Sequence, residues 1–168
     1  MMGRRARAFY TGHPTHLTAR GVDDQPLFHS DLDRYELLAL MRKTTERIGW
    51  HVLCWCLMTT HYHLLVVVPD GRRVSWAMQV VNSVYAREFN SRHRRRGALF
   101  GNRFADTLVE SDPQCERTIA YILENPVRAG IVKGVEDWPW SGLETLRARD
   151  EVDTLSTPTL DIPVRLAG

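Results

Sequence analysis

Residues 51–68 have the sequence HVLCWCLMTTHYHLLVVV, in which a polar break at Thr59-Thr60 separates two apolar runs. The runs, residues 51–58 and 62–68, are rich in valine, leucine and aromatic side chains, which predicts two β-strands. Each run is apolar at consecutive positions, so both faces of each strand should meet apolar neighbours. We therefore expect two central strands of a sheet that helices cover on at least one side.

Helical patterns lie on both sides of these strands. Ser30 or Asp31 can cap a helix that runs to about residue 48, where Gly49 ends it. A second helix is predicted over residues 74–92, after a Pro-Asp-Gly turn. Its apolar stripe has the spacing of one helix face and consists of Val74, Met78, Val81, Tyr85 and Phe89.

Weaker signals indicate three further elements. A short alternation over residues 15–19 predicts a first strand, and residues 98–110 predict a bent or broken strand. Asp112-Pro113 is a helix cap followed by a proline in the first turn, which predicts a third helix. We expect this helix to run to about residue 124 and to stop near Asn125-Pro126.

The resulting order is strand, helix, strand, strand, helix, strand, helix. Its first six elements match a ferredoxin-like α+β sandwich, in which a central antiparallel sheet carries two helices on one face. The third helix would follow as a C-terminal addition. A chain of 168 residues fits one domain. We assign residues 1–145 to it and expect residues 146–168 to be a loosely packed C-terminal extension.

The net charge of +2 implies no particular partner, but the arginines are unevenly distributed. Residues 87–103 contain six arginines and one glutamate, and Arg72-Arg73 precede them. A basic block of this kind suits an anionic polymer such as nucleic acid. A solvated surface loop explains the block equally well, so charge alone does not decide.

The cysteines and the hydropathy pattern predict a cytoplasmic protein. The three cysteines, Cys54, Cys56 and Cys115, are an odd number and do not form a zinc-type pair, which favours buried thiols over a disulfide framework. The basic start MMGRRARAF is not followed by the apolar core of a signal peptide. No apolar stretch approaches the roughly 20 residues that span a bilayer, so we expect no membrane association.

His61 and His63 lie two residues apart in the second central strand. Residues i and i+2 of a strand point to the same face, so the two imidazoles should project side by side. Neutral imidazole is a common metal ligand, and one ion could bind both rings. Two partly buried histidines that are merely hydrogen-bonded are the alternative, and the spacing alone does not exclude it.

Tyr121 lies away from the apolar stripe of the third helix. At about 100° per residue, it is displaced by about 160° to 200° from Ile119 and Leu123. Asn125 follows one turn later on the face of Tyr121. The pair presents either a rim tyrosine that packs beside its neighbours or a phenol and a carboxamide directed toward a cleft.

Five segments occur in an order that resembles a known family. They are HLTARG, CLMTTHYHLLV, RRGALFGNRF, YILENPVRAGIV and DWPWS, and they lie within about residues 8–143. Together they resemble the single-tyrosine HUH transposases, specifically the REP-associated tyrosine transposases, which act on repetitive extragenic palindromes. A histidine–hydrophobe–histidine motif alone is weak evidence, whereas its combination with YxxxNPVRAG at this distance is specific.

The resemblance implies roles for particular residues. His61, His63 and Asn125 would hold Mg²⁺ or Mn²⁺, and Tyr62 would point to the opposite face. Tyr121 would be the nucleophile of a DNA-binding transposase that cleaves and rejoins single-stranded DNA near hairpins through a 5′-phosphotyrosine. Two features are less usual for the family: Thr59-Thr60, where relatives often have a proline or asparagine before the motif, and Gly101-Asn102. Neither removes a catalytic group.

The implied partner is single-stranded DNA with a palindromic hairpin, bound by a monomer or homodimer. Candidate phosphate contacts are Arg72, Arg73, Arg92, Arg94, Arg95, Arg96, Arg103 and Arg128. His16 and Arg20 alternate on the first strand and could lie near the site, although His16 could equally be structural. For Trp76 and Phe100, we favour core packing over base stacking.

Two other functions remain compatible with the residues. A domesticated relative could bind hairpin DNA without cutting it. The presence of His61, His63 and Tyr121 argues against this function, because a pure binding module needs no nucleophile. A metal-dependent nuclease could use water, and its cleavage would survive Tyr121→Phe. Tyr85 is a rival nucleophile, but its place on the apolar stripe of the second helix indicates a core residue.

Overall fold

The computed structural model describes residues 11–144 and 146. Within them lie the helices α1 (Asp31–Ile48), α2 (Val74–Arg92) and α3 (Asp112–Arg128). The strands are β1 (Pro14–Arg20), β2 (His51–Leu57), β3 (His61–Val67), β4 (Ala105–Leu108) and β5 (Ser141–Leu143). No helix in the described part is long and apolar enough to cross a membrane.

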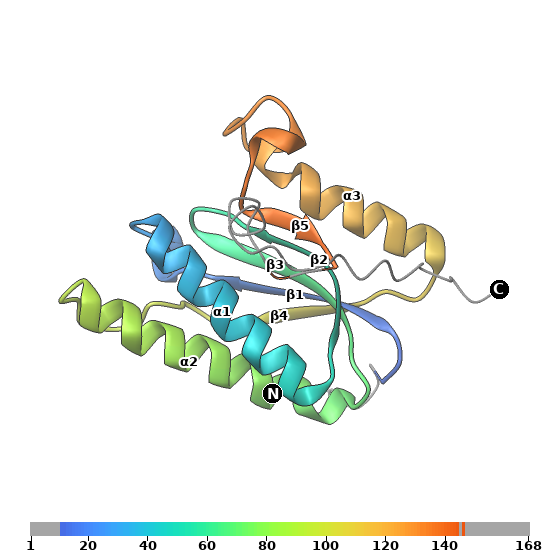
Figure 1. Cartoon of the computed structure of the whole chain (residues 1–168), viewed down its shortest axis with the longest axis horizontal. Coiled ribbons are helices and arrows are strands. Elements are labelled where there is room, and N and C mark those ends of the chain that lie inside the picture. The colour runs from blue at the N-terminus through green and yellow to red at the C-terminus, as the bar shows by residue number, and fades with distance from the viewer. Residues whose placement is uncertain (1–10, 145, 147–168) are drawn as a thin grey trace, which may run out of the picture.

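The strands form one antiparallel sheet in the order β4-β1-β3-β2-β5. α1 and α2 pack together on one face, and α3 lies across the other face (Figure 1). The first six elements thus have the order and layers expected from the sequence. The predicted ferredoxin-like α+β sandwich with an added C-terminal helix is confirmed.

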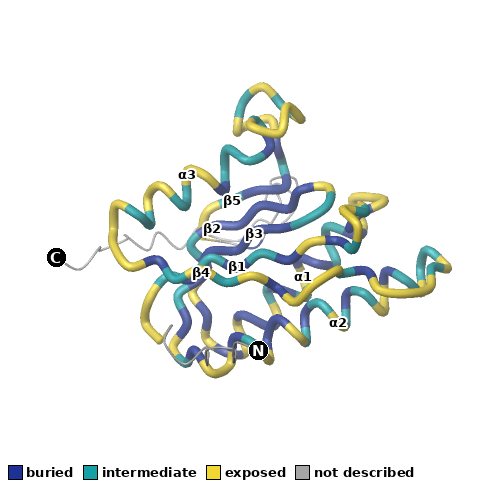
Figure 2. The backbone as a smooth tube through the Cα atoms, turned by 180° about the vertical axis from the view of Figure 1, so that it is seen from behind, coloured by how far each residue is buried: buried dark blue, intermediate teal, exposed yellow. Residues whose placement is uncertain are grey.

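The two apolar runs form the middle of the sheet. β3 pairs with β1 on one side and with β2 on the other, and its residues from Tyr62 to Val66 are all buried. Figure 2 shows β2 and β3 as mostly buried strands between the helical layers. Full burial of one aliphatic side chain contributes roughly 1.5–3 kcal/mol. This core therefore fixes the position of the histidines at the start of β3.

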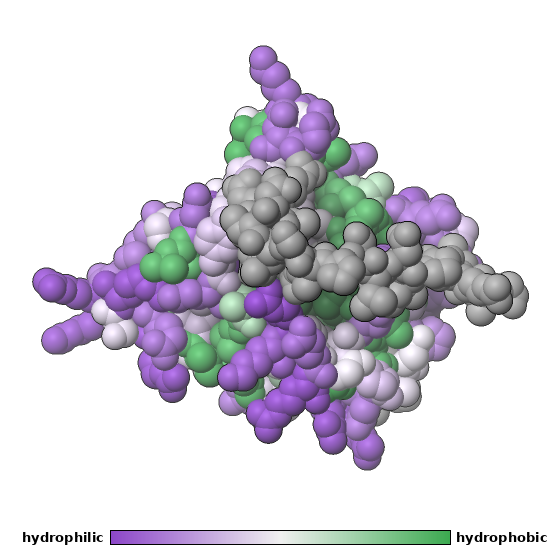
Figure 3. Space-filling model, in the orientation of Figure 1, coloured by the Kyte–Doolittle hydropathy of each residue, from purple (hydrophilic) through white to green (hydrophobic). Residues whose placement is uncertain are grey.

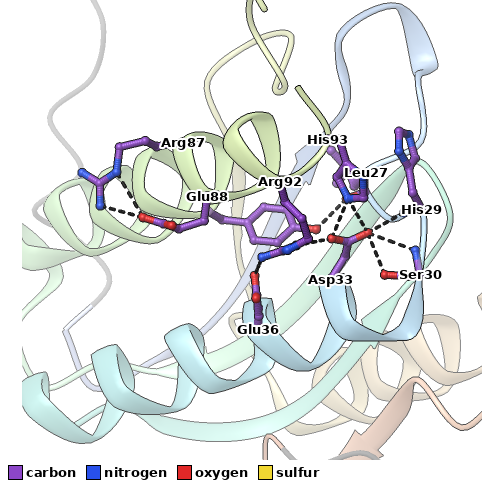
Figure 4. Close-up of polar contacts among 10 residues, drawn as sticks. Leu27, His29, Ser30, Asp33, Glu36, Arg87, Glu88, Arg92 and His93 are labelled. Carbon is purple, nitrogen blue, oxygen red and sulfur yellow. Dashed lines mark hydrogen bonds and ion pairs between the residues drawn. The ribbon is translucent and has the colours of Figure 1, made fainter. Parts of the chain in front are cut away.

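Asp33, in the first turn of α1, connects the two helices of the sandwich. Its carboxylate accepts hydrogen bonds from the backbone N–H groups of His29 and Ser30, at 2.8 and 3.0 Å. Arg92, at the end of α2, donates to Asp33 and to Glu36, and the His93 ring lies 2.9 Å from Asp33 (Figure 4). The carboxylate therefore caps α1 and holds the C-terminus of α2 against it.

The surface is mainly hydrophilic on the side that carries α1 and α2. In Figure 3, outside the grey segment, polar side chains dominate this face and hydrophobic patches are small and separate. The apolar stripe of α2 instead faces the sheet, because Val74, Met78, Val81, Tyr85 and Phe89 are all buried. Tyr85 is thus a core residue, as its place on the stripe indicates.

The third helix is longer than the sequence suggests. We expected it to stop near Asn125-Pro126, but α3 continues to Arg128 with Pro126 inside it. Pro126 is buried, and it lies within the last turn, where the missing N–H removes only one helical hydrogen bond. The turn is closed beyond the proline by a hydrogen bond from the Ala129 N–H to the Asn125 carbonyl, at 2.9 Å.

Two other segments differ in extent from the expectation. Of residues 98–110, only Ala105–Leu108 pair as a strand, while Phe100 makes an isolated bridge to Gly21. β5 was not anticipated, because its three residues are too few to show a period. Buried Trp138 fixes this segment, since its indole N–H donates to the carbonyl of Leu57 at the end of β2.

Trp76 and Phe100 were both expected to pack in the core. The prediction of core packing was wrong for Trp76, whose side chain is 45% exposed beside Arg47 on α1. Phe100 is half-buried against Tyr62 and Tyr85.

Among the cysteines, Cys54 and Cys56 are buried thiols, and burial raises the pKa of each to about 12. Cys115 is a free thiol that is only partly buried.

The predicted C-terminal extension lies almost wholly outside the described residues. Leu146 is described and is buried. Residue 145 and residues 147–168 are not described, so the domain boundary at residue 145 stays a prediction.

Candidate functional site

The site begins with the two histidines at the start of β3. His61 and His63 project from the same face of the sheet, and their ring centroids are 4.9 Å apart. Tyr62, between them, is buried on the other face, where its hydroxyl donates to Asn82 on α2 at 2.6 Å. The alternation of the strand therefore directs both imidazoles toward the side of the sheet that carries α3.

α3 brings Tyr121 to this pair. The Tyr121 ring centroid lies 5.8 Å from that of His63 and 6.3 Å from that of His16 on β1. The tyrosine side chain is 42% exposed, whereas the next residue, Ile122, is completely buried and anchors the helix. We call His16, His61, His63 and Tyr121 the histidine–tyrosine cluster. Three separate elements contribute to it.

β1 and the turn before β3 contribute hydrogen bonds to the cluster. His16 Nε2 lies 2.9 Å from His63 Nδ1, and Thr18 Oγ1 lies 3.2 Å from the same atom. Thr60 Oγ1 lies 3.2 Å from His61 Nδ1. Sequence reasoning missed Thr18 and Thr60. The available signal for Thr18 was its place between His16 and Arg20 in an alternating strand.

The electrostatics of the site favour neutral imidazoles. Burial, followed by the positive charge of Arg20, lowers the pKa of His61 to about 4. Burial, followed by His16, His61 and Arg20, lowers the pKa of His63 to about 3. Burial also lowers the pKa of His16. At neutral pH the rings therefore carry lone pairs, which is the form that binds metal ions.

The donor types present in the site fit a divalent ion. His63 Nε2 is buried and has no hydrogen-bond partner among the described residues. Asn125 donates from Nδ2 to the Tyr121 carbonyl at 3.0 Å, which leaves its amide oxygen as a ligand atom one turn from Tyr121. In the described part of the chain, no group of three histidine, cysteine or acidic ligands exists. Two imidazoles and one amide oxygen are the available donors.

Acidification should destabilise the metal-free protein from about pH 6.5 downward. Unfolded histidine takes up a proton near pH 6.5, whereas folded His61 and His63 resist protonation until about pH 4 and pH 3. Between these values the unfolded state binds more protons, so the free energy of unfolding falls as the pH falls. Thermal melts from pH 7.5 to 4.5 measure this dependence.

Variants assign the acid effect to the buried pair. His63→Gln should flatten the fall in melting temperature, while His51→Gln, at an exposed position of β2, should leave it as in the wild type. Equal slopes for the wild type and for His63→Gln would show that His63 is not the source.

The predicted DNA-binding arginines are dispersed rather than gathered. Arg103 and the near-site residue Arg20 line a hollow of about 470 Å³ beside Thr18 and Asn102, next to the cluster. Arg20 also pairs with Asp24 at 2.7 Å. Arg72 and Arg73 follow the end of β3 that is far from the histidines, and both face Asp70.

The basic block itself is partly engaged inside the protein. Arg92 is held by Asp33 and Glu36, and Arg95 donates to Gln25, Asn90 and the Ala98 carbonyl. Arg94 and Arg96 are exposed. Arg128 pairs with Glu124 at 3.1 Å, and its guanidinium carbon lies 5.8 Å from the centroid of the Tyr121 ring. Arg92 has the most buried ion pairs of the set, and the phosphate contacts of all these arginines stay predictions.

Comparisons with known proteins extend over most of this structure. The family model for IS200-like transposases matches residues 10–125. A curated protein of Haemophilus influenzae, whose name assigns it to the REP-associated tyrosine transposases, is 25% identical over 118 residues. That match covers 63% of this chain and 66% of the relative, which is just under two thirds of its length.

A solved structure supports the fold independently. It is the structure of a REP-associated tyrosine transposase bound to a REP hairpin, with 20% sequence identity and a TM-score of 0.69. The superposition covers 83% of this chain and 82% of the other. The resemblance to REP-associated tyrosine transposases is thus confirmed, and the matched residues 10–125 include both histidines of β3, Tyr121 and Asn125. The chain belongs to the family of IS200-like transposases.

Proposed function

We propose that this protein cleaves and rejoins single-stranded DNA near hairpins, with Tyr121 as the nucleophile and a divalent ion on His61 and His63. The observation that carries the proposal is the position of Tyr121, whose ring centroid lies 5.8 Å from that of His63 although the two residues belong to different layers. A phenol can act as the nucleophile of phosphoryl transfer, and two neutral imidazoles together with an amide oxygen from the helix of Tyr121 are donor types that a divalent ion can take.

In the proposed reaction, the Tyr121 oxygen attacks the phosphorus of a phosphodiester. The new bond joins the phenolic oxygen to phosphorus, and the bond from phosphorus to the 3′ oxygen breaks. The phenolic proton is lost and the departing oxygen gains one, which gives a 5′-phosphotyrosine and a free 3′-OH. A second 3′-OH can reverse the step and join strands without ATP, because the phosphotyrosine ester conserves the energy of the bond.

The chain's own residues position the reactants. β3 holds His61 and His63 on one face, and Asn125 would supply the third ligand from the helix that carries Tyr121. When bound, a divalent ion would stabilise negative charge on the phosphate and orient it for attack. Imidazole ligands suit Mn²⁺ better than Mg²⁺, which prefers oxygen, so we expect stronger activity with Mn²⁺ in vitro.

The substrate we propose is single-stranded DNA that carries a palindromic hairpin. The similar solved structure contains a REP hairpin, and this chain shares its fold over most of its length. The hollow lined by Arg20 and Arg103 adjoins Thr18 and offers cationic groups for backbone phosphates beside the cluster. Exposed Arg94 and Arg96 could contact the flanks of such a substrate.

Metal removal should abolish a covalent protein–DNA adduct. Labelled hairpin oligonucleotides with single-stranded flanks are mixed with the protein and Mn²⁺ and then separated on a denaturing gel. We expect a shifted band that disappears with EDTA and falls at least about 100-fold in His61→Ala, because the phosphate loses the ion that stabilises its charge. The matched control is His51→Ala, an exposed histidine that should retain the band.

Other outcomes would identify other functions. Cleavage without an adduct would indicate a nuclease that uses water. Tight binding of several hairpins, measured by fluorescence anisotropy, with neither cleavage nor adduct would indicate a binding module. An adduct that persists in EDTA would contradict the metal requirement.

A further inference from the structure

The two histidines of β3 use the same ring atom to contact their neighbours. His61 Nδ1 lies 3.2 Å from Thr60 Oγ1, and His63 Nδ1 lies 2.9 Å from His16 Nε2. In an imidazole, Nδ1 and Nε2 lie on opposite sides of the ring. Occupation of both Nδ1 atoms therefore leaves both Nε2 atoms available, and His63 Nε2 is buried without a partner among the described residues.

The sheet register explains why His16 reaches His63. Thr18 lies directly opposite His63 on the neighbouring strand, and His16 lies opposite Leu65, two residues further along β3. His16 is thus a diagonal neighbour of His63 on the same face, a distance that a long or aromatic side chain can bridge. The ring centroids of the two histidines are 5.1 Å apart.

We infer that His16 is a positioning residue that accepts a hydrogen bond from the Nδ1–H of His63 and thereby keeps the lone pair of His63 on Nε2. The inference rests on the proposed function, because the lone pair serves the divalent ion. A ligating histidine commonly donates its other ring N–H to a neighbouring acceptor, which sets both its tautomer and its orientation. His16 supplies that acceptor from β1.

The opposite tautomer fits the surroundings less well. If His16 Nε2 carried the proton and donated to His63, then His63 would carry its own proton on Nε2. That N–H group would be buried with no acceptor among the described residues. Buried N–H groups without partners are rarer in proteins than acceptors with an unused lone pair. The environment therefore favours the metal-binding tautomer before any ion arrives.

Thr18 contacts both His16 and His63, at longer distances than the two histidines contact each other. Its hydroxyl lies 3.2 Å from His63 Nδ1 and 3.3 Å from His16 Nε2, so its oxygen can accept a second, longer hydrogen bond from the Nδ1–H of His63 while His16 Nε2 accepts the shorter one. The contact between His16 and His63 is the shorter one. Loss of His16 should therefore have the larger effect, and Thr18→Val serves as a matched control on the same strand.

The test reads the tautomer and the metal affinity separately from activity. Long-range ¹H–¹⁵N spectra of the metal-free protein report which nitrogen of His63 carries the proton. Titration with Mn²⁺ in the absence of DNA, followed by electron paramagnetic resonance of the free ion, gives the dissociation constant. The variants are His16→Leu, which removes the acceptor, and His16→Gln, which restores an amide oxygen.

We expect the wild-type His63 to carry its proton on Nδ1. In His16→Leu the tautomers should mix and the Mn²⁺ dissociation constant should rise about 10- to 100-fold, the range found when such a partner of a ligand is removed. His16→Gln should recover most of the affinity, and Thr18→Val should change it less than about threefold. Circular dichroism and thermal melts verify that each variant is folded.

Two results would overturn the inference. One is a wild-type His63 protonated on Nε2, and the other is a folded His16→Leu variant with unchanged tautomer and Mn²⁺ affinity. If either occurs while the wild type forms the Mn²⁺-dependent adduct, the role of His16 fails and the proposed function stands. A wild type that binds no Mn²⁺ and forms no adduct would overturn the proposed function and, with it, the purpose assigned to His16.

Discussion

Tyr121→Phe should eliminate the covalent DNA adduct and lower strand cleavage at least about a thousandfold, the scale expected when an enzyme loses its nucleophile. The change removes one oxygen and keeps the ring that lies beside His16 and His63. Tyr121 is 42% exposed, so the loss of its hydroxyl should cost little stability. Metal affinity should also persist, because no proposed ligand is altered. The measurement is a denaturing gel with a time course of cleavage.

Tyr85→Phe is the matched control for this experiment. Tyr85 is buried in the helical layer, and its hydroxyl donates to the Leu27 carbonyl at 2.6 Å. Its replacement should cost about 1 kcal/mol of stability through the lost hydrogen bond, while the adduct remains. An adduct that survives Tyr121→Phe and disappears in Tyr85→Phe would reverse the assignment of the nucleophile. Cleavage at the wild-type rate in Tyr121→Phe would favour water as the attacking group.

Asp33→Ala should destabilise the fold by about 2–4 kcal/mol, because it removes charge-assisted hydrogen bonds to a buried carboxylate together with the cap of α1. The Asp33 side chain is completely buried between α1 and α2 (Figure 4). Burial acts to raise the pKa of its carboxyl group, but hydrogen bonds from His93, His29 and Ser30 outweigh this effect and lower the pKa. Alanine would leave Arg92 with one carboxylate fewer and α1 without its cap. Urea denaturation measures the loss.

Glu36→Ala tests whether the loss of stability in Asp33→Ala comes from the burial of the carboxylate rather than from its charge alone. Glu36 binds the same arginine, but its side chain is 36% exposed, so its removal should cost only about 0–1 kcal/mol. A similar small loss in both variants would mean that the Asp33 carboxylate acts as an ordinary surface charge. Because the junction lies on the opposite face of the sheet from Tyr121, folded Asp33→Ala protein should still form the adduct at low temperature.

The main elements were predictable because their signals are local. The five apolar positions of the α2 stripe recur every three or four residues over about four turns, and the apolar runs of β2 and β3 are bounded by the polar Thr59-Thr60. The end of α3 was not predictable in this way. Pro126 reads as a helix breaker, and only its burial in the tertiary structure shows why the helix continues past it. Exposed Trp76 was a different kind of error, because it lies two residues from both Val74 and Met78, about 200° from the buried stripe of α2, so the helical period itself indicates exposure.

In the site too, local sequence patterns indicate some residues, whereas the contacts between distant residues were not predictable. The shared face of His61 and His63 follows from the period of a strand, and the displacement of Tyr121 from its apolar stripe follows from the period of a helix. The contact between His16 and His63 joins residues 47 positions apart, and the link from Arg92 to Asp33 joins residues 59 apart. No local pattern encodes such pairings. The sequence therefore identified the candidate groups, while their partners emerged only from the folded sheet and helices.

The carboxylate partners of the arginines bear on how salt should affect DNA binding. Each phosphate contact by a free cation releases counterions and contributes about 0.7 to the slope of log affinity against log salt for single strands. Of the eight arginines predicted to bind DNA, four already face Asp or Glu side chains: Arg72, Arg73, Arg92 and Arg128. An arginine whose charge is already balanced by a carboxylate neutralises less phosphate charge and so displaces fewer of the cations condensed on the DNA. The slope should therefore be nearer to about 2–3 than to the value of about 6 that eight independent contacts would give.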